Sequence, residues 1–274
     1  MVSSGGGNGN WLELDSGPGI CGEMGAAYRK GVFGKTAEGD AVDGRVGLVT
    51  GGGSGIGAAT ARRLLGGGYR VVVTGRSGEK LRAFAAGLGD PAGLVVVPGD
   101  AADHVAVRAA VGEAVERFGR LDCVVANAGF ATFDELGDGD PAGWRDMVLT
   151  NVLGPMVLID AALPALRETK GRIVLVGSVA GHVYSPGNIY GATKWAVTGL
   201  AENLRRALID DGIGVTLVSP GATRTDFFDA MPGGVPDRDY LSADKLGETI
   251  VWALTQPEGV DVNTIVIRPT GMFV

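Results

Sequence analysis

The stretch VGLVTGGGSGIGAATARRLL, residues 46–65, decides the fold. Its first five residues are mostly apolar and predict a buried strand, whereas residues 55–65 predict a helix. Between them, Gly51, Gly55 and Gly57 follow the spacing G-x3-G-x-G. Glycines at these positions let the backbone turn tightly and approach a pyrophosphate at the N-terminus of the following helix. The stretch therefore predicts a strand–loop–helix unit that binds a dinucleotide.

Glycine is unusually common in this chain, at 48 of 274 residues, whereas proteins average about 7%. Three glycines at fixed offsets therefore recur by chance in a chain of this length, and the spacing alone is a weak signal. The position of the loop between a predicted strand and a predicted helix is what favours a dinucleotide site.

From Arg45 onward, short apolar runs alternate with helix-length segments. The predicted strands are 46–50, 70–74, 93–97, 121–126, 172–177, 215–219 and 264–267. The clearest predicted helices are 55–65, 104–118, 144–166 and 190–209. The runs are nearly continuous in Val, Ile and Leu, as expected of parallel strands covered on both faces. We therefore predict an α/β fold: one domain, 45–274, with a doubly wound, Rossmann-type parallel sheet of about seven strands and helices on both faces.

Residues 1–44 differ from the rest of the chain. They are rich in Gly, Ser and Asn and show neither a strand period nor a helix period. We predict a mostly disordered N-terminal extension, with a short ordered turn at 26–33 as an option; it lacks the features of a secretory signal. An over-extended start codon or a cloning artefact would explain the same composition equally well.

Composition excludes several classes of function. The chain has 24 basic and 31 acidic residues, a formal charge of −7 and a pI near 4.9, which argues against nucleic acid or an anionic membrane surface as partner. No apolar run approaches the roughly 18 residues of a membrane span. The two cysteines, Cys21 and Cys123, and the two histidines, His104 and His182, predict no disulfide framework and no metal site. We expect a cytoplasmic protein.

The end of the second predicted strand indicates which nicotinamide cofactor the protein binds. A carboxylate at its end would accept hydrogen bonds from the adenosine ribose, but Gly75 stands there, followed by Arg76. A guanidinium suits a 2′-phosphate, so we predict NADP(H) rather than NAD(H), with a solvated surface arginine as the alternative. Asp100 and the segment 127–129 follow the next two strands at the ligand-binding edge of the sheet. An ordinary turn residue is an equally good interpretation of Asp100.

The strongest local signal is IVLVGSVAGHVYSPGNIYGATKWAVTGL, residues 173–200. Tyr190 and Lys194 are four apart at the start of a helix and therefore share one face. A free tyrosine, with a pKa near 10, is a poor acid–base catalyst at neutral pH, and a nearby ammonium would lower that pKa. Ser178 ends the preceding strand and can place a hydroxyl beside the phenol. The arrangement predicts a tyrosine acid–base catalyst.

Taken together, these motifs resemble the short-chain dehydrogenase/reductase superfamily, in its compact single-domain branch with TGxxxGIG and YxxxK motifs. The matching segments, in order, are TGGGSGIG (50–57), NAG (127–129), LTNVLGP around Asn151, Ser178, YGATK (190–194) and PGATRT (220–225). The resemblance covers about 230 residues, and six ordered motifs make it specific.

The resemblance implies a catalytic tetrad of Asn151, Ser178, Tyr190 and Lys194. Tyr190 would donate a proton to a carbonyl oxygen as hydride arrives, or accept one from an alcohol. Ser178 would hydrogen-bond the same oxygen. Lys194 would bind the nicotinamide ribose and lower the pKa of the tyrosine, and Asn151 would hold a water that relays protons to solvent.

The resemblance also implies the residues that hold the cofactor. Asp100 and Ala101 would border the adenine, and Thr223 would lie near the carboxamide side of the nicotinamide. Ser54 stands where many NADP-binding relatives carry a basic residue, so the 2′-phosphate assignment depends almost entirely on Arg76. The full set is Gly51, Gly53, Ser54, Gly55, Ile56, Gly57, Arg76, Asp100, Ala101, Asn127, Ala128, Gly129, Tyr190, Lys194, Pro220, Gly221, Thr223 and Thr225.

In the family the segment after Gly221 forms a lid over the substrate, here about 222–241. Apolar side chains in and around it predict an apolar or aromatic carbonyl substrate, although the phenylalanines could equally pack the lid onto the domain. The candidate substrate contacts are Phe130, His182, Tyr184, Phe227 and Phe228. A small 3-hydroxy acid is the runner-up; Arg224 and Arg238 could bind its carboxylate, but four aspartates accompany them in the lid.

Two further expectations concern assembly and activity. In the family the two long helices form a four-helix subunit interface, so the resemblance implies a homodimer or homotetramer. A catalytically silent, NADP-binding redox sensor is the alternative of another class. The complete tetrad favours an oxidoreductase that interconverts a ketone or aldehyde and its alcohol, because a sensor does not need those four residues together.

Overall fold

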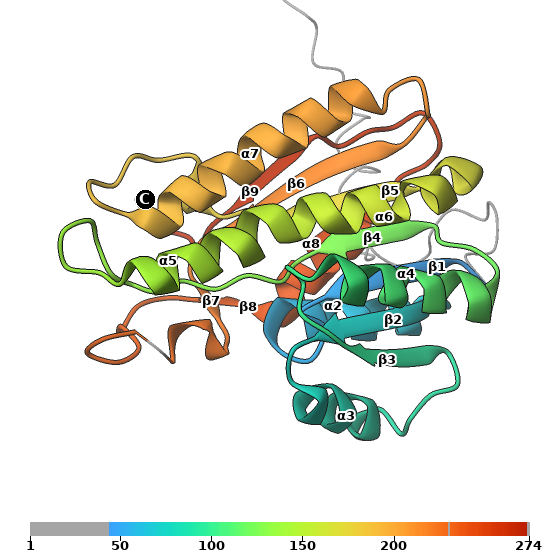
Figure 1. The fold of residues 1–274 in the computed structure, drawn as a ribbon, viewed down its shortest axis with the longest axis horizontal. Coiled ribbons are helices and arrows are strands. Elements are labelled where there is room, and N and C mark those ends of the chain that lie inside the picture. The colour runs from blue at the N-terminus through green and yellow to red at the C-terminus, as the bar shows by residue number, and fades with distance from the viewer. Residues whose placement is uncertain (1–43, 230, 273–274) are drawn as a thin grey trace, which may run out of the picture. The chain divides into compact units, whose positions relative to one another are not determined.

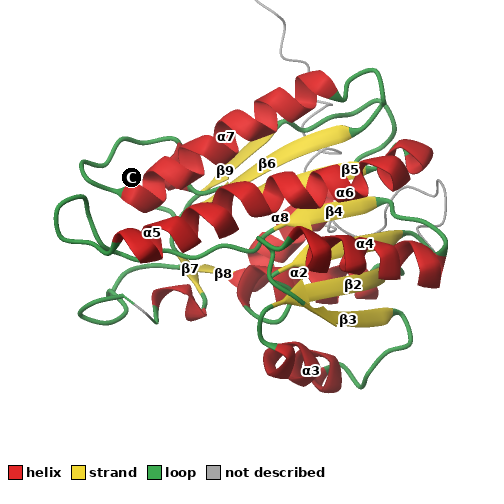
Figure 2. Ribbon diagram, viewed as in Figure 1, coloured by secondary structure: helices red, strands yellow, loops and turns green. Residues whose placement is uncertain are grey.

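The structure is a computed structural model that describes residues 44–229 and 231–272. Within these residues seven strands form one parallel sheet (Figures 1 and 2). In spatial order they are β3 (Leu94–Pro98), β2 (Arg70–Gly75), β1 (Val46–Thr50), β4 (Cys123–Ala126), β5 (Arg172–Val176), β6 (Gly214–Pro220) and β9 (Thr264–Ile267). The chain adds β2 and β3 on one side of β1 and then crosses over to add β4 and the later strands on its other side, which makes the sheet doubly wound. The predicted fold class is confirmed. The predicted disordered extension lies outside the described residues, Gly44 excepted.

Alternate residues of each strand enter different cores on the two faces of the sheet. On one face Leu48 and Ile173 pack beneath α4 (His104–Phe118), α6 (Gly154–Thr169) and α7 (Ile189–Ala207). On the other, Val49 and Val174 pack beneath α2 (Gly55–Gly66), α3 (Gly78–Gly87) and α8 (Ala243–Leu254). Figure 1 shows α4, α6 and α7 on the near side of the sheet and α2 and α8 behind it. Both faces are buried, which explains why the strand sequences are almost continuously apolar.

The predicted helix 144–166 begins earlier and is interrupted. It starts as α5 (Pro141–Val148), where the Asp140 side chain accepts a hydrogen bond from the Ala142 amide and proline occupies the first turn. A π-helical turn, Leu149–Leu153, then joins α5 to α6. Asp140 and Pro141 mark this helix start in the sequence, and a prediction from apolar periodicity alone does not use them. The other predicted boundaries lie within about two residues of the observed ones, and α4 matches its prediction.

The composite helix Pro141–Thr169 corrects one expectation. It has 29 residues and is apolar enough, by length and composition, to span a membrane, so the expectation that no apolar run approaches that length was wrong. The helix lies in the core layer instead: Leu158, Ile159 and Leu166 are fully or almost fully buried against the sheet. Helices that cover a parallel sheet need one broad apolar face, and this one also exposes Val148 and Met156. The subunit interface expected on the two long helices, and with it the homodimer or homotetramer, stays a prediction.

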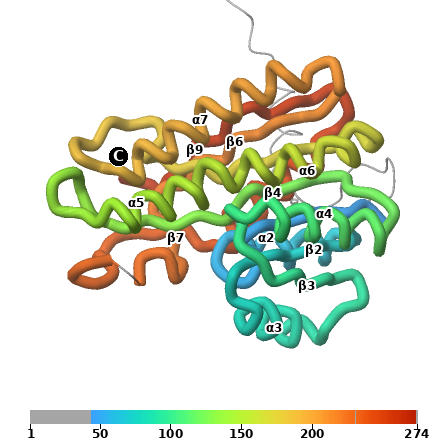
Figure 3. Tube along the Cα trace, in the orientation of Figure 1, coloured from blue at the N-terminus to red at the C-terminus, as the bar shows by residue number. Residues whose placement is uncertain are grey.

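The segment predicted as a lid is fastened at both ends. Two short parallel strands, β7 (Thr223–Arg224) and β8 (Leu241–Ser242), pair with each other. Between them the chain forms a short 3-10 helix, η3 (Asp226–Phe228), and a loop. Figures 1 and 3 show this segment beside β7, apart from the main sheet, and Figure 1 labels β8 and α8 where the segment ends. The lid is therefore a closed loop whose base is held by backbone hydrogen bonds.

The crossing of α2 and α8 predicts a stability difference between two glycines. A Cβ added at Gly247 would lie 2.9 Å from the backbone carbon of Ala59, whereas one added at Gly112 on α4 would meet nothing within 4 Å. We expect Gly247→Ala to lower the free energy of unfolding by about 1–3 kcal/mol through overpacking. Gly112→Ala should raise it by up to about 1 kcal/mol through helix propensity. Denaturant titration measures both, and a Gly247→Ala variant as stable as Gly112→Ala would contradict the close packing.

Candidate active site

The carboxyl ends of six strands meet at one edge of the sheet and carry most of the predicted site residues. Because the strands are parallel, the residues that follow them are brought together from distant parts of the sequence. They line a cavity of about 970 Å³. The predicted residues that line it are Gly51, Gly53, Ser54, Gly55, Ile56, Arg76, Asp100, Ala101, Asn127, Ala128, Gly129, Phe130, Ser178, Tyr190, Lys194, Pro220, Gly221, Thr223, Thr225, Phe227 and Phe228.

The glycine loop adopts a backbone that other residues would not tolerate. Gly51 and Gly55 have φ angles of +65° and +52°, a region that strongly favours glycine. A Cβ at Gly57 would lie 2.3 Å from the Gly51 carbonyl oxygen, so only glycine allows this approach. Gly57 itself lies beneath the loop and does not line the cavity.

The N-terminus of α2 faces the cavity without a protein anion. Ser54 precedes the helix but makes no side-chain capping hydrogen bond, and the first turn contains no acidic residue. Exposed N–H groups at a helix start carry partial positive charge and bind phosphate. This end of the cavity therefore fits a pyrophosphate.

Asn127 and Thr50 hold the glycine loop against the end of β4. The Asn127 side-chain nitrogen donates to the Thr50 carbonyl at 2.8 Å, and the Thr50 hydroxyl accepts from the Asn127 and Ala128 amides at 3.0 and 3.1 Å. The Asn127 side-chain nitrogen thus donates its hydrogen bonds to the glycine loop of the protein itself. Thr50 was not among the predicted site residues, although its position as the last residue of the first predicted strand places it at the ligand-binding edge of the sheet.

Two cations stand at the end of β2. The Arg76 guanidinium lies over the Phe130 ring, 5.5 Å from its centroid, and no carboxylate within the described residues forms an ion pair with it. Lys80, on the first turns of α3, lines the same cavity and pairs with Asp226 of η3 at 2.9 Å. The ion pair joins the lid to α3 at this end of the cavity. Sequence reasoning missed Lys80, because it lies far from Asp226 in the chain.

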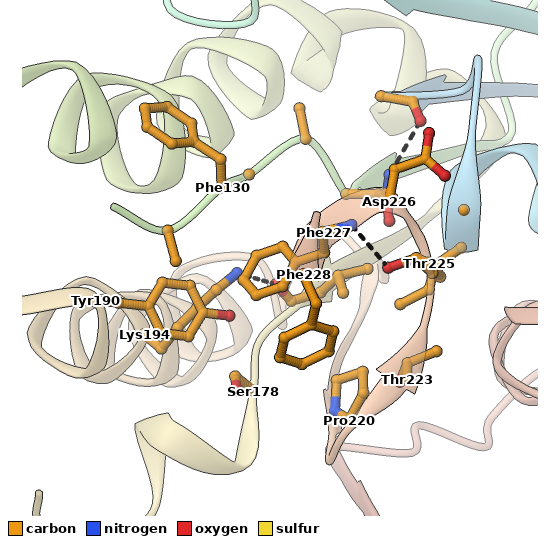
Figure 4. Close-up of a pocket in the computed structure, with 18 of the residues that line it drawn as sticks. Phe130, Ser178, Tyr190, Lys194, Pro220, Thr223, Thr225, Asp226, Phe227 and Phe228 are labelled. Atoms are coloured by element: carbon orange, nitrogen blue, oxygen red, sulfur yellow. Dashed lines mark hydrogen bonds between the residues drawn. The ribbon is translucent and has the colours of Figure 1, made fainter. Parts of the chain in front are cut away.

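Ser178, Tyr190 and Lys194 meet at the other end of the cavity (Figure 4). Ser178 follows β5, and its hydroxyl accepts from the Ala180 amide at 3.1 Å. Tyr190 lies in the first turn of α7, which begins there because the Asn188 side chain accepts from the Gly191 amide at 2.9 Å. The buried Lys194 ammonium donates to the Val176 carbonyl at 2.9 Å. Two caps and one backbone acceptor therefore set the positions of these three side chains.

The pKa shifts at this site differ from the expectation. Withdrawal from water raises the pKa of Tyr190 to about 12, opposed only by a hydrogen bond with Ser178. Burial lowers the pKa of Lys194 to about 8. The expected lowering of the tyrosine pKa by the lysine was wrong for the protein alone, because the ammonium lies over the ring face, 5.7 Å from its centroid, and is itself poorly solvated. The phenol is therefore neutral at pH 7 and is a proton donor.

Asn151 lies behind the cavity rather than in its wall. Its side-chain nitrogen donates to the Phe130 carbonyl at 2.9 Å and to the Thr193 hydroxyl at 3.0 Å, and its oxygen accepts from the Phe130 amide. Both amide donors are thus taken by protein groups, so they are not free to hold the predicted water. The π-turn carries Asn151 between the β4 loop and α7, and π-turns frequently occur at functional sites.

Aromatic side chains enclose the space beside Tyr190 (Figure 4). The Phe227 ring lies 5.6 Å from the Tyr190 ring, 5.4 Å from Phe133 and 5.2 Å from Phe228, centroid to centroid. The Thr225 hydroxyl accepts from the Phe227 amide, which fixes the start of η3. The lid phenylalanines thus do both things considered from the sequence: they pack the lid and they line the cavity.

Two predicted substrate contacts do not line the cavity. The Tyr184 side chain is 90% exposed and stacks on Trp195 at 5.2 Å, outside the site. The His182 ring turns away from the cavity and hydrogen-bonds the Ser219 hydroxyl at 2.8 Å. Both predictions were wrong because the turn after Ser178 directs its successive side chains to different sides. No cluster of three metal-ligating side chains occurs in the described part of the chain.

Comparison with known proteins agrees with this geometry. The family model described as short chain dehydrogenase matches residues 45–233. An uncharacterized oxidoreductase of Staphylococcus haemolyticus is 34% identical over 230 residues, which cover 83% of this chain and 98% of the relative. An alcohol dehydrogenase from the archaeon Thermococcus sibiricus, complexed with 5-hydroxy-NADP, has a TM-score of 0.76 and 28% identity, covering 83% of this chain and 97% of that one. A 3-ketoacyl-(acyl-carrier-protein) reductase from Brucella melitensis, complexed with NADH, has a TM-score of 0.73 and 26% identity, covering 82% and 97%.

Fold, site and comparisons together define an NAD(P)-dependent oxidoreductase with a Rossmann-type sheet. The chain belongs to the short-chain dehydrogenase/reductase family.

The buried Lys194 predicts a specific pH dependence of stability. Its pKa of about 8 in the folded protein lies below the value of about 10.4 for an unfolded lysine. The unfolded state therefore binds more protons between pH 8 and 10, and the contribution of this residue to stability rises with pH in that window. The free energy of unfolding of wild type minus that of Lys194→Met should increase by about 2 kcal/mol from pH 8 to 10.

Denaturant titration of the cofactor-free proteins across this range measures the difference. The same difference should stay constant between pH 6 and 7, where the lysine is protonated in both states. A flat difference throughout would show that the ammonium is not held in a poorly solvated position.

Proposed function

We propose that this protein is an NADP(H)-dependent reductase that interconverts a ketone or aldehyde and its alcohol, with an apolar or aromatic carbonyl compound as substrate. The observation that carries the proposal is the convergence of Ser178, Tyr190 and Lys194 at the aromatic end of a cavity that continues to the glycine loop. A cofactor held along the loop would thus extend toward the catalytic tyrosine.

The cofactor fits the residues that line this cavity. The N-terminus of α2 suits its pyrophosphate, and the segment Pro220–Thr223 with Lys194 would hold its nicotinamide end. When bound, the nicotinamide supplies or accepts the hydride.

The chain's own groups then handle the carbonyl oxygen. Tyr190, neutral at pH 7, donates its phenolic proton to this oxygen during reduction. The Ser178 hydroxyl hydrogen-bonds the same oxygen and orients the carbonyl. Lys194, with a pKa of about 8, is positively charged at neutral pH, and its ammonium lies 5.7 Å from the Tyr190 ring centroid, so it would hold the nicotinamide end of the cofactor and keep a positive charge beside the phenol.

Cofactor preference rests on the end of β2. Arg76 has no carboxylate partner among the described residues, and Ser77 caps α3 beside it. A 2′-phosphate there would gain charge-assisted hydrogen bonds from the guanidinium, whereas the 2′-hydroxyl of NAD carries no charge to pair with it. The two solved structures above hold an NADP derivative and NADH, so the preference depends on this chain's own residues.

Substrate class rests on the lid. Phe133, Phe227 and Phe228 present three rings toward the catalytic tyrosine, which suits a flat apolar body. A small 3-hydroxy acid fits less well: Arg238 lines the cavity, but Asp134 and Glu135 line it as well. These two carboxylates would repel a carboxylate substrate bound to the guanidinium.

The catalytic role of the phenol predicts loss of turnover in Tyr190→Phe. Removal of a general acid lowers rates by about 10²–10⁴-fold. NADPH oxidation with a panel of aromatic ketones, aldehydes and β-keto acids should fall by that factor, while NADPH binding, measured by fluorescence titration, is retained. Tyr184→Phe is the matched control, because that ring lies outside the cavity, and it should keep full activity. A fully active Tyr190→Phe would overturn the role; tight NADPH binding by a wild type without turnover would favour the redox sensor.

The 2′-phosphate assignment predicts a cofactor-selective effect of Arg76→Ala. Loss of a charge-assisted hydrogen bond worth about 1.5–3 kcal/mol should raise KM for NADPH by about 10–100-fold. KM for NADH should change less than about threefold, because NADH carries an uncharged 2′-hydroxyl in place of the phosphate. Arg62→Ala, an exposed change on α2, is the control. A wild type that prefers NADH would refute the Arg76 assignment and leave the tyrosine mechanism intact.

A further inference from the structure

We propose that His182 is a positioning residue, whose hydrogen bond to Ser219 fixes the catalytic Ser178 relative to the loop at Pro220 that would hold the nicotinamide. The inference rests on the proposed function and adds to it a residue that does not touch the cavity.

The bond joins two segments at the point where their sheet contact ends. The last backbone hydrogen bond there runs from the Gly177 amide to the Val218 carbonyl at 2.7 Å. Beyond it, the chain after β5 turns toward α7, while β6 continues into Pro220 and the lid. The His182 Nε2 atom lies 2.8 Å from the Ser219 hydroxyl across this divergence, and Ser219 is fully buried. A side-chain bond thus continues the connection where the ladder stops.

The turn between Ser178 and His182 is short and internally bonded. The Ser178 carbonyl accepts from the Gly181 amide, and the Val179 carbonyl accepts from the His182 amide, both at 2.9 Å. The Ser178 hydroxyl accepts from the Ala180 amide as well. A displacement of the imidazole is therefore passed to Ser178 rather than absorbed within the turn.

The turn is also confined from the side of α7. A Cβ at Gly181 would lie 2.6 Å from the Lys194 carbonyl oxygen, and the Thr198 hydroxyl donates to the Gly181 carbonyl at 3.2 Å. The turn thus has two supports: α7, which carries Tyr190, and Ser219, which precedes the nicotinamide loop. The second support adds to the Gly177–Val218 hydrogen bond and joins the far end of the turn to the segment that leads into that loop.

The surroundings of His182 favour a neutral imidazole in this hydrogen bond. Partial burial and the nearby Arg268, which follows β9, both lower the pKa of the imidazole. A neutral imidazole has one donor and one acceptor nitrogen, and a serine hydroxyl can pair with either. The bond therefore persists at neutral pH without placing a positive charge beside the nicotinamide loop.

A double-mutant cycle tests the proposal on the full chain with NADPH and the best carbonyl of the panel. We expect His182→Leu and Ser219→Ala each to lower kcat by about tenfold, because small misplacements of reacting groups have effects of this order. The dissociation constant of NADPH should change less than about threefold. The double variant should be no slower than the slower single variant, since both changes remove one bond.

Three further measurements separate positioning from a structural role. The deuterium isotope effect on kcat with 4-deuterated NADPH should rise in both single variants, because hydride transfer becomes slower than other steps. His182→Gln, which keeps a polar nitrogen near Nε2, should recover part of the lost kcat. His104→Leu, at the exposed start of α4, should leave every value unchanged.

Unchanged kcat and isotope effect in variants whose only defect is a lower unfolding midpoint would overturn the positioning role. Additive losses in the double variant would also overturn it, because the two residues would then act separately. If wild type binds NADPH but reduces no carbonyl, the proposed function fails, and the fluorescence of the bound nicotinamide decides this inference instead. Its emission should change in His182→Leu and Ser219→Ala at saturating NADPH, and identical emission would refute the inference.

Discussion

The site depends on a contact between two pieces of backbone. Gly57, in the first turn of α2, lies against the Gly51 carbonyl so closely that no side chain could stand between them. This contact turns the chain sharply from β1 into α2 and directs the helix N-terminus into the cavity. Asn127 then bonds to the same loop, so the halves of the sheet on either side of β1 are joined at the place where a pyrophosphate would bind.

The other end of the cavity is arranged differently, by groups that bond to protein rather than to a ligand. Asn188 caps α7, the Val176 carbonyl accepts from Lys194, and Asn151 connects the β4 loop to Thr193. Each of these bonds fixes a neighbour of the phenol. The side chains at this end are thus held by hydrogen bonds within the protein, and such fixed positions are what electrostatic and positional catalysis requires.

The sequence predicted the sheet, its helices and the residues at the carboxyl edge, because these follow from local patterns and from parallel topology. It did not predict the partners of those residues. Lys80 and Asp226 are 146 positions apart, and no local pattern relates them. The errors at His182 and Tyr184 have a similar cause: in an irregular turn, direction depends on a few dihedral angles that composition does not determine.

The Lys80–Asp226 ion pair makes the attachment of the lid sensitive to salt. Both side chains are more than half exposed, and such pairs contribute only about 0.2–1 kcal/mol. Thermal motion therefore breaks the pair easily, and the lid is held mainly by its aromatic contacts and by the pairing of β7 with β8. Added salt weakens such exposed pairs further, because the Debye length is about 8 Å at physiological ionic strength and shorter at higher salt. The ionic part of the attachment of the lid to α3 thus depends on the ionic strength of the surrounding solution, whereas the aromatic part does not.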